Sequence, residues 1–365
     1  MIIVRFGGKT LDVISARDAS IKWGISQRRV AILCAENRIP GAQILGNMWL
    51  IPEDAKKPED GRNLRYKEMP TKDVKPFLKW AGGKGQLLSK IGEYYPKKNS
   101  NITKYCEPFI GGGAVFFDII SKYKFKEVLL TDINPELVNA YIQVRDNVEQ
   151  LIEQLKVLQK EYLAKDELGR KNYYLKNRDR YNELIKNGSE KDNLEKAVLM
   201  LFINRTCFNG LYRVNSKGLY NVPAGKYTNP LICNDMNLRN VSKCLQGVQI
   251  RNGDFTLTRD FIDENTFVYC DPPYRPITEG GFNSYDKSDF NDDEQIRLAK
   301  YIEEMNQKGA SILLSNSDPK NADQNDDFFD DLYSKFNINR VYASRNINSD
   351  ASGRGKITEL LIANC

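Results

Sequence analysis

The chain has 365 residues, of which 41% are hydrophobic and 28% charged, as expected of a globular protein with two or three domains. It contains no histidine, which excludes Ser–His and Cys–His nucleophile pairs and zinc sites built on imidazole. The net charge of +6 is uneven, since residues 1–70 hold twelve Lys and Arg against eight Asp and Glu, whereas residues 286–331 hold five against thirteen. A phosphate-binding surface is therefore expected to include the first segment and to exclude the second.

No run of about 18 apolar residues occurs, so we expect no membrane span, and the N-terminal residues are not typical of a signal peptide. The seven cysteines are scattered without a C-x-x-C pair. This pattern indicates neither a disulfide framework nor a metal site, and a reducing, cytoplasmic location is expected.

Residues 1–52 show the pattern of two short helices around a tight turn. Ser15 is suited to cap a helix over residues 16–23, and Gly24 interrupts the chain before a second helix. The pattern resembles helix-turn-helix domains of the excisionase and MerR-like type, whose second helix enters the major groove, with residues 43–52 as a small wing. A helical hairpin for protein contacts is the alternative. The predicted DNA contacts, at the start of the second helix, are Gln27, Arg28 and Arg29.

Residues 53–73 are charged, contain Pro and Gly and lack apolar periodicity, which predicts a linker. From residue 74 onward, short apolar runs alternate with amphipathic stretches, which predicts an α/β domain with a mainly parallel sheet. Residues 148–250 interrupt this alternation with helices and a loop-rich piece, as expected of a substrate-recognition insert. The catalytic domain is therefore predicted to consist of residues 74–147 and 251–365.

The segment EPFIGGG carries a glycine-rich turn that follows an apolar run and opens a helix. Glycine lets the backbone pass close to a ligand, so Gly111 and Gly113 are candidate cofactor contacts. Asp132 ends the next apparent strand, where its carboxylate can accept hydrogen bonds from both ribose hydroxyls. Nicotinamide-binding folds use a similar turn, so the turn by itself leaves the cofactor open.

Four further residues extend this cofactor site. Trp80 can pack against a sulfonium or an adenine, and Lys84 can meet the carboxylate of a methionine moiety. After the apparent strand in VQIRNGD, Asp254 can accept a hydrogen bond from an adenine amine, and Phe255 can stack on the ring. The ordinary alternatives are core packing for Trp80 and a solvated charge for Lys84. Together with the glycine turn, the four residues predict binding of S-adenosylmethionine.

Residues 268–274, VYCDPPY, place two prolines and a tyrosine after an apolar strand. The exocyclic amine of adenine is a weak nucleophile because its lone pair is delocalised into the ring. Asp271 can accept one amine hydrogen and the Pro272 carbonyl the other, which stabilises the positive charge that develops during methyl transfer. Tyr274 can stack on a base swung out of the duplex. An ordinary D-P-P turn is the alternative.

The segments FLKWAGGK, EPFIGGG, TDIN and VYCDPPY, in this order, resemble the Dam-type family of DNA adenine methyltransferases, the α class, from about residue 75 to the C-terminus. The resemblance implies a Rossmann-like methyltransferase sheet and transfer of a methyl group to adenine N6 in double-stranded DNA, with base flipping. It also implies that S-adenosylmethionine is bound through Trp80, Lys84, Asp132 and Asp271.

Residues 204–227, NRTCFNGLYRVNSKGLYNVPAGKY, resemble the recognition hairpin of this family. The resemblance implies that Asn209 and Leu211 wedge into the base stack, that Arg213 reads guanine, and that the target is GATC. Lys226 and Tyr227 would contact phosphate or neighbouring bases. A solvated hairpin is the alternative. The family pattern begins near residue 77, so the extra N-terminal residues leave open whether the hairpin alone selects the target.

Two other functions fit the sequence: a DNA-binding regulator with a vestigial methyltransferase domain, and a methyltransferase of single-stranded nucleic acid or RNA. The intact Asp271, Tyr274 and Lys84 favour an active enzyme. The sequence leaves open the exact target, a companion restriction endonuclease, and a chromosomal, phage or mobile-element role. We expect a monomer or weak dimer with DNA as its partner.

Overall fold

The computed structural model describes residues 2–6, 9–24, 26–35, 39–46, 48–57, 74–97, 100–275, 290–344 and 356–364. The chain divides into two compact units, Met1–Pro70 and Thr71–Cys365. Most of the predicted linker, residues 58–73, lies outside the described residues. Within the described ranges, no helix combines the length and apolar character needed to cross a membrane.

The first unit combines two helices with a small antiparallel sheet. The strands, in spatial order, are β1 (Ile2–Phe6), β2 (Lys9–Ser15), β4 (Met48–Pro52) and β3 (Gln43–Leu45). The helix α1 (Ala16–Trp23) begins where the Ser15 side chain accepts a hydrogen bond from the Asp18 amide, and it ends at Gly24, whose φ of 64° lies in the left-handed region. The helix α2 (Gln27–Ala35) follows.

The two helices of the first unit share one core. Ala19 and Trp23 of α1 belong to the same buried cluster as Val30 and Leu33 of α2. The strands β3 and β4 pair as an antiparallel hairpin. Two helices, the turn at Gly24 and a hairpin are therefore present in this unit.

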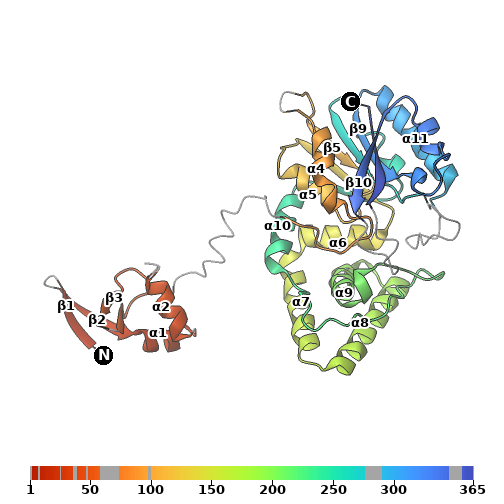
Figure 1. Ribbon diagram of the computed structural model, residues 1–365. Coiled ribbons are helices and arrows are strands. Elements are labelled where there is room, and N and C mark those ends of the chain that lie inside the picture. Colours follow the sequence, from red (N-terminus) through yellow and green to blue (C-terminus); the bar gives the residue numbers. More distant parts are fainter. Residues whose placement is uncertain are drawn as a thin grey trace. The chain divides into compact units, whose positions relative to one another are not determined.

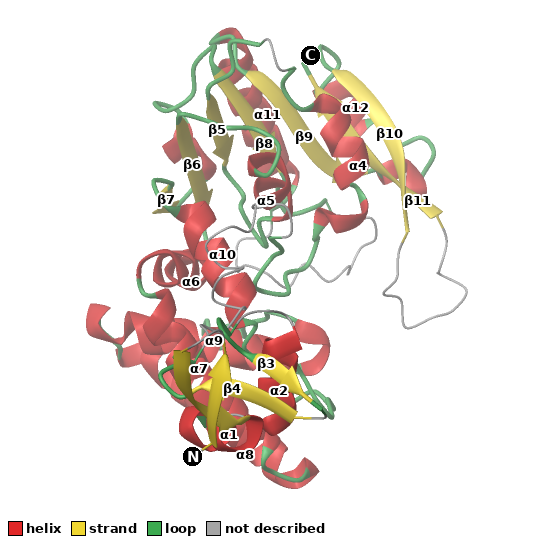
Figure 2. Cartoon of the chain, turned by 90° about the vertical axis from the view of Figure 1, so that its left-hand side faces the viewer, coloured by secondary structure: helices red, strands yellow, loops and turns green. Residues whose placement is uncertain are grey.

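The second unit is built on a seven-stranded sheet in the order β10-β11-β9-β8-β5-β6-β7 (Figure 2). The pairs from β7 through β9 are parallel, and β10 and β11 form an antiparallel edge next to β9. The predicted α/β fold with a mainly parallel sheet is confirmed. Its strands are β5 (Lys104–Glu107), β6 (Glu127–Asp132), β7 (Gln249–Asn252), β8 (Thr266–Cys270), β9 (Ser311–Ser317), β10 (Asn337–Ser344) and β11 (Lys356–Ala363).

Helices cover both faces of this sheet, with α5 and α11 on opposite sides (Figure 1). All five residues of the central strand β8 are buried. Phe267 and Tyr269 point into the core shared with α5 and α6, whereas Val268 and Cys270 point into the core shared with α11. The covering helices are η2 (Lys84–Gln86), α4 (Leu88–Ile91), η3 (Gly92–Tyr94), α5 (Ala114–Ile120), α6 (Pro135–Asp146), η6 (Phe255–Thr258), α11 (Asp292–Gln307), η7 (Pro319–Asn321) and α12 (Phe328–Leu332).

The region between α6 and β7 is mainly helical and lies beyond one end of the sheet (Figure 1). The helix α9 is buried along almost its whole length, because α6, α7 and α8 all pack against it. The elements here are α7 (Val148–Leu163), α8 (Glu167–Asn187), η4 (Glu190–Asp192), α9 (Asn193–Thr206), η5 (Phe208–Gly210) and α10 (Asp235–Leu245).

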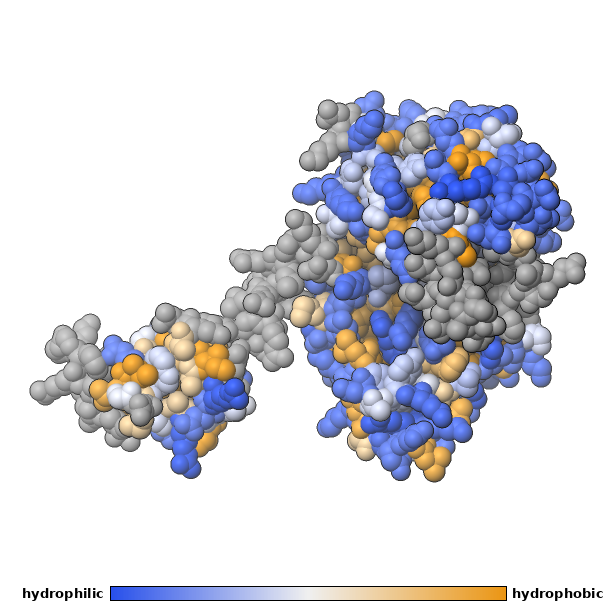
Figure 3. All heavy atoms as spheres, viewed as in Figure 1, coloured by the Kyte–Doolittle hydropathy of each residue, from blue (hydrophilic) through white to orange (hydrophobic). Residues whose placement is uncertain are grey.

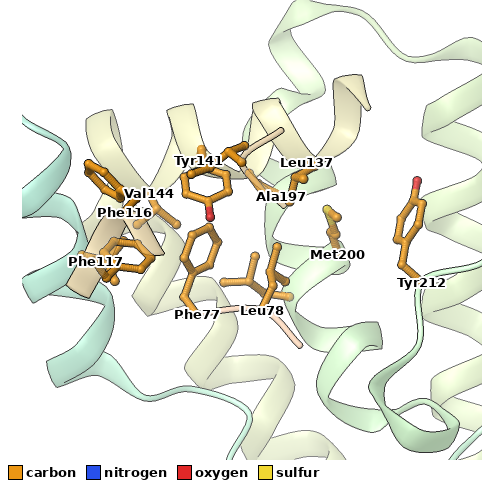
Figure 4. Close-up of a cluster of buried hydrophobic side chains, with 14 of the residues drawn as sticks. Phe77, Leu78, Phe116, Phe117, Leu137, Tyr141, Val144, Ala197, Met200 and Tyr212 are labelled. Atoms are coloured by element: carbon orange, nitrogen blue, oxygen red, sulfur yellow. The ribbon is translucent and has the colours of Figure 1, made fainter. Parts of the chain in front are cut away.

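One hydrophobic core joins this helical region to the sheet domain. Figure 4 shows Phe117 of α5 and Tyr141 of α6 in the same cluster as Ala197 and Met200 of α9, with Phe77 between them. The face visible in Figure 3 is mostly hydrophilic on this unit, as expected of a surface facing water. The helical region is therefore held against the sheet domain by burial rather than by a flexible connection.

Candidate active site

Three carboxylates lie at the edge of the sheet where the parallel strands end. Glu107 is the last residue of β5, Asp132 is the last residue of β6, and Asp271 directly follows β8. From β5 the chain continues to β6 and β7 on one side of the sheet and later to β8 and β9 on the other. Open α/β sheets bind ligands at such a reversal, outside the carboxyl ends of the strands, so this edge is the candidate active site.

The glycine turn after β5 is tied to the end of β6. The Gly111 amide donates a hydrogen bond of 3.0 Å to Asp132 Oδ2, and the Asn134 amide donates one of 3.0 Å to Oδ1 of the same carboxylate. Tyr141 Oη donates to the Gly111 carbonyl at 3.1 Å. Gly113 then opens α5 with a φ of 72°, in the left-handed region that favours glycine. These bonds fix the path of the turn.

Trp80 borders this glycine turn. A Cβ atom added at Gly111 would lie 3.2 Å from Trp80 Cδ1, so the indole packs directly against the backbone. On its other side the indole stacks on Tyr212, with ring centroids 5.0 Å apart and an interplanar angle of 29°. Trp80 is half-buried. It therefore joins the turn to the hairpin segment, residues 204–227.

Lys84 and the segment after β8 converge although they are far apart in the sequence. Lys84 is only 5% exposed, and its Nζ lies 2.8 Å from Asp271 Oδ1. The same ammonium donates to the Gly82 carbonyl at 2.8 Å and lies 4.6 Å from the centre of the Tyr274 ring. A buried ammonium requires such partners, so the Lys84 side chain is held within the site.

Asp271 carries the most constrained carboxylate of the site. Besides Lys84, Ser315 Oγ donates a hydrogen bond of 3.0 Å to Asp271 Oδ1. Burial raises the pKa of Asp271 above its ordinary value, and the ammonium of Lys84 and the two hydrogen bonds offset only part of this increase. The side chain stays 20% exposed, so an approaching molecule can reach the carboxylate.

The Asp-Pro-Pro-Tyr backbone is anchored beyond Pro272. Gln295 Nε2 donates to the Pro273 carbonyl at 3.1 Å, and Tyr274 Oη donates to Glu359 Oε2 at 2.7 Å. None of the described residues donates a hydrogen bond to the Pro272 carbonyl. Among the described residues, the carbonyl of Pro272, which follows Asp271 in the chain, therefore keeps its accepting capacity.

Asp254 and Phe255 follow β7, and Arg297 of α11 covers both. Arg297 Nη2 donates to Asp254 Oδ2 at 2.7 Å, and its Nη1 donates to Oδ1 at 3.0 Å. Burial by itself raises the pKa of Asp254, but the hydrogen bonds from Arg297 and Thr256 outweigh it and lower this pKa to about 2. Phe255 is 2% exposed, with the Arg297 guanidinium 4.2 Å from its ring centre. Stacking of an adenine on that ring face requires Arg297 to move.

The hairpin segment (residues 204–227) is joined by two isolated antiparallel bridges, one between Cys207 and Ala224 and one between Val214 and Tyr220. Asn209 is exposed and has a φ of 54°, the one positive φ among the described residues other than glycine. Leu211 is half-buried against the main core. The segment is therefore an irregular hairpin rather than a regular two-stranded ribbon.

Arg213 is held across this hairpin by Asn221. Its Nε donates to Asn221 Oδ1 at 2.7 Å, and its Nη2 donates to the Asn221 carbonyl at 3.3 Å. Lys226 is exposed, and Tyr227 lies beneath the Lys79 ammonium, which is 5.0 Å from the centre of its ring.

In the first unit, Gln27 and Arg28 are exposed, whereas the side chain of Arg29 lies outside the described residues.

The structure adds Glu107 to the residues singled out from the sequence. Glu107 is 2% exposed and accepts a hydrogen bond of 2.6 Å from Tyr105 Oη. Burial raises its pKa well above the ordinary value; the Tyr105 hydroxyl opposes this rise, and the nearby Asp271 and Asp132 carboxylates add to it. Its position at the end of an apolar strand, first in EPFIGGG, was the available sequence signal. Among the described residues, no group of His, Cys, Asp and Glu is arranged to hold a metal ion.

A glycine turn, strand-end carboxylates and an Asp-Pro-Pro-Tyr segment at one sheet edge define an α/β enzyme with a cofactor site. Residues 80–347 match the model of the family described as D12 class N6 adenine-specific DNA methyltransferase. The chain belongs to this family. It is an adenine-specific DNA methyltransferase, and S-adenosylmethionine is its methyl donor.

Several curated relatives support this assignment. The chain is 50% identical to the type II methyltransferase M.MjaIII of Methanocaldococcus jannaschii, over 80% of this chain and 99% of the relative. It is 34% identical to the DNA adenine methylase of Haemophilus influenzae, over 79% of this chain and 92% of the relative. It is 31% identical to the DNA N-6-adenine-methyltransferase of Escherichia phage P1, over 92% of this chain and 43% of the relative.

Replacing Gly113 with alanine tests the role of the glycine turn. A Cβ atom there would lie 2.5 Å from Tyr141 Oη and 3.0 Å from Phe117 Cε2, in addition to the strain of the positive φ. We expect Gly113→Ala to weaken binding of S-adenosylmethionine at least about tenfold and to lower the thermal midpoint, because a clash of this kind typically costs 1–3 kcal/mol. Isothermal titration calorimetry and thermal unfolding measure the two effects.

Gly247→Ala is the matched control for this variant. Gly247 has a φ of 77°, but a Cβ atom there meets nothing within 4 Å. The control therefore carries the backbone strain without the clash. Equal cofactor affinity in the two variants would contradict the role assigned to the turn.

Proposed function

We propose that this enzyme methylates adenine N6 at GATC sites in double-stranded DNA, with Asp271, Pro272 and Tyr274 as its catalytic residues. The observation that carries the proposal is the position of Asp271, which follows β8 at the edge where the neighbouring strand β5 leads into the glycine turn. The Asp271 carboxylate and the adjacent Pro272 carbonyl suit an amine whose two hydrogens are held while the nitrogen gains a methyl group, after which one of the two leaves as a proton.

The residues at this edge fit S-adenosylmethionine, which supplies a methyl group on a positively charged sulfur. The carboxylates of Asp132 and Asp271 lie at this edge, where they can interact favourably with a cationic cofactor. The absence of a Cβ atom at Gly111 lets the turn pack closely against the Trp80 indole at this edge. We assign the cofactor contacts to Trp80, Lys84, Gly111, Gly113, Asp132, Asp254, Phe255 and Asp271.

In the proposed reaction, Asp271 accepts one hydrogen of the adenine amine and the Pro272 carbonyl accepts the other. These hydrogen bonds draw the nitrogen lone pair out of the ring and stabilise the positive charge that develops on the nitrogen. Tyr274 stacks on the flipped base. The chemistry uses no histidine, in keeping with the composition of the chain.

Transfer of labelled methyl groups from S-adenosylmethionine to duplex DNA tests the proposed chemistry directly. We expect wild-type enzyme to label duplex DNA containing GATC, and Asp271→Ala to reduce the rate at least about a thousandfold, because the variant lacks the main acceptor of the amine hydrogen. DNA affinity, measured by fluorescence anisotropy, should change little.

Retained turnover in Asp271→Ala would overturn the role of this carboxylate. Faster labelling of single-stranded than of duplex DNA would overturn the proposed substrate. Mapping the methylated adenines in DNA from cells that express the chain determines the target sequence, and methylation outside GATC would refute that part of the proposal.

We assign target recognition to Asn209, Leu211, Arg213, Lys226 and Tyr227 of the hairpin segment. An arginine can donate two hydrogen bonds to the O6 and N7 acceptors of guanine in the major groove. The Asn221 contacts occupy Arg213 Nε and one hydrogen of Nη2, so Nη1 keeps its hydrogens for a base. Asn209 and Leu211 precede it on the same segment, where they would enter the base stack.

We expect Arg213→Ala to relax discrimination at one guanine by about 1–3 kcal/mol, the usual contribution of an arginine–guanine contact. The measurement is kcat/KM on GATC duplexes and on duplexes in which that guanine is replaced. Lys217→Ala is the control, because Lys217 is an exposed cation in the turn of the same hairpin. Unchanged base preference in Arg213→Ala would remove this residue from recognition.

We also propose that the first unit is a helix-turn-helix domain that adds DNA affinity. Gln27 and Arg28 are exposed at the start of α2, the helix that enters the major groove in such domains. The alignment with the phage P1 relative covers 92% of the chain, more than the Thr71–Cys365 unit holds, so it extends into this region. A companion endonuclease and a monomeric or weakly dimeric state stay predictions.

Arg28→Ala tests the first unit. We expect it to weaken duplex binding about three- to tenfold and to reduce the slope of log affinity against log salt by about one, as for loss of one phosphate contact. Fluorescence anisotropy over a range of salt concentrations gives both values. Arg17→Ala, on the exposed side of α1, removes the same charge as a control. Equal losses in both variants would contradict a specific role of α2.

A further inference from the structure

Ser315 lies on β9 and has no solvent-exposed surface, yet its hydroxyl points at the site. Its Oγ donates to Asp271 Oδ1 at 3.0 Å, and the Lys84 ammonium lies 2.8 Å from the same oxygen. Among the described residues, no hydrogen bond is made to the other carboxylate oxygen, Asp271 Oδ2. The two oxygens of the catalytic carboxylate therefore differ, since one has two donors and the other has accepting capacity left.

The direction of the hydrogen bonds behind Ser315 is fixed by proton counting. A serine hydroxyl has a single proton, and here Ser315 gives it to Asp271, because a carboxylate can only accept. The bond of 3.0 Å between Tyr269 Oη and Ser315 Oγ must then be donated by the tyrosine. Tyr269 is buried on the central strand β8, so it fixes the rotamer of Ser315 from within the core.

We propose that Ser315 is a positioning residue for methyl transfer, which holds Asp271 so that Oδ2, and not Oδ1, accepts the hydrogen of the adenine amine. The inference rests on the proposed function, because it presupposes that Asp271 binds that amine. Lys84 by itself gives Oδ1 one donor on a long side chain. Ser315, on the neighbouring strand of the sheet, adds a second and rigid donor that stops rotation of the carboxylate.

The same bond affects the protonation of Asp271. The titratable groups around this carboxylate are Lys84 of η2, Glu107 of β5, Tyr269 and Cys270 of β8, and Tyr274 with its partner Glu359 of β11. Burial already raises the pKa of Asp271, and a donor to the ionised form lowers it. Removal of the Ser315 hydroxyl raises this pKa further. The ionised carboxylate is the form that accepts the amine hydrogen and stabilises the positive charge on the nitrogen. A higher pKa of Asp271 therefore moves the acidic limb of the rate profile to higher pH.

The test compares Ser315→Ala with Ser317→Ala in the full-length enzyme. Ser317 is also a buried serine of β9, but its Oγ donates to the Arg275 carbonyl at 3.1 Å and not to Asp271. Single-turnover rates are measured with saturating duplex DNA and labelled S-adenosylmethionine between about pH 5 and 9, the range in which a raised carboxyl pKa shows. Calorimetry gives the affinity for S-adenosylmethionine.

For Ser315→Ala we expect a rate about 10- to 100-fold lower, the usual effect of losing a hydrogen bond to a charged group, and an acidic limb shifted to higher pH. Cofactor affinity should stay within about threefold of wild type, since the carboxylate and Lys84 remain. Tyr269→Phe, which keeps Ser315 but removes the donor behind it, should change the rate in the same direction by a smaller factor.

A Ser315→Ala variant with the rate and pH profile of Ser317→Ala would overturn the proposal. So would a lower rate without any shift of the acidic limb, because a general loss of packing does not move a carboxyl pKa. Asp271→Asn separates this inference from the function on which it rests. If Asp271→Asn is inactive while Ser315→Ala behaves as the control, only the role of Ser315 fails, whereas an active Asp271→Asn refutes the proposed role of Asp271 as well.

Discussion

The parallel pairing of β6, β5, β8 and β9 is the constraint on which the site depends. Parallel strands end at the same edge, so the turn after β5, the carboxylate that ends β6 and the segment after β8 become neighbours. Residues more than 150 positions apart, such as Glu107 and Asp271, lie close enough for their charges to interact for this reason. Helices on both faces keep water from the strands, which makes the pairing stable.

Burial also strengthens the electrostatic interactions between the charged groups of the site. Lys84 and Asp271 are paired where little solvent reaches them, so each hydrogen bond to the carboxylate has a larger effect on its pKa than at the surface. Removing either partner would leave an uncompensated buried charge. At Asp271 burial outweighs the hydrogen bonds and the pKa is raised. At Asp254 the hydrogen bonds from Arg297 and Thr256 outweigh burial, and the pKa is lowered.

Hydrogen bonds of Asn204 add to the shared core in holding the catalytic and recognition parts together. The buried Asn204 of α9 donates from Nδ2 to the carbonyls of Lys79 and Gly210 and accepts from the Lys79 amide. Lys79 precedes Trp80 at the cofactor turn, and Gly210 lies in the hairpin segment. These hydrogen bonds tie the hairpin segment to the backbone next to Trp80.

The sequence by itself determined the local chemistry. Apolar runs predicted the strands of the parallel part of the sheet, glycines predicted the turn after β5, and the order of the four motifs predicted an adenine methyltransferase. Only the tertiary structure decided the hydrogen-bond partners of these residues. Asp271 is paired with Ser315, Tyr274 with Glu359, Asp254 with Arg297 and Arg213 with Asn221. Three of these four contacts join separate elements, and the fourth crosses a hairpin. The reason is physical, because periodicity and local propensity specify an element, whereas the contacts of its side chains depend on which elements pack together and in which register.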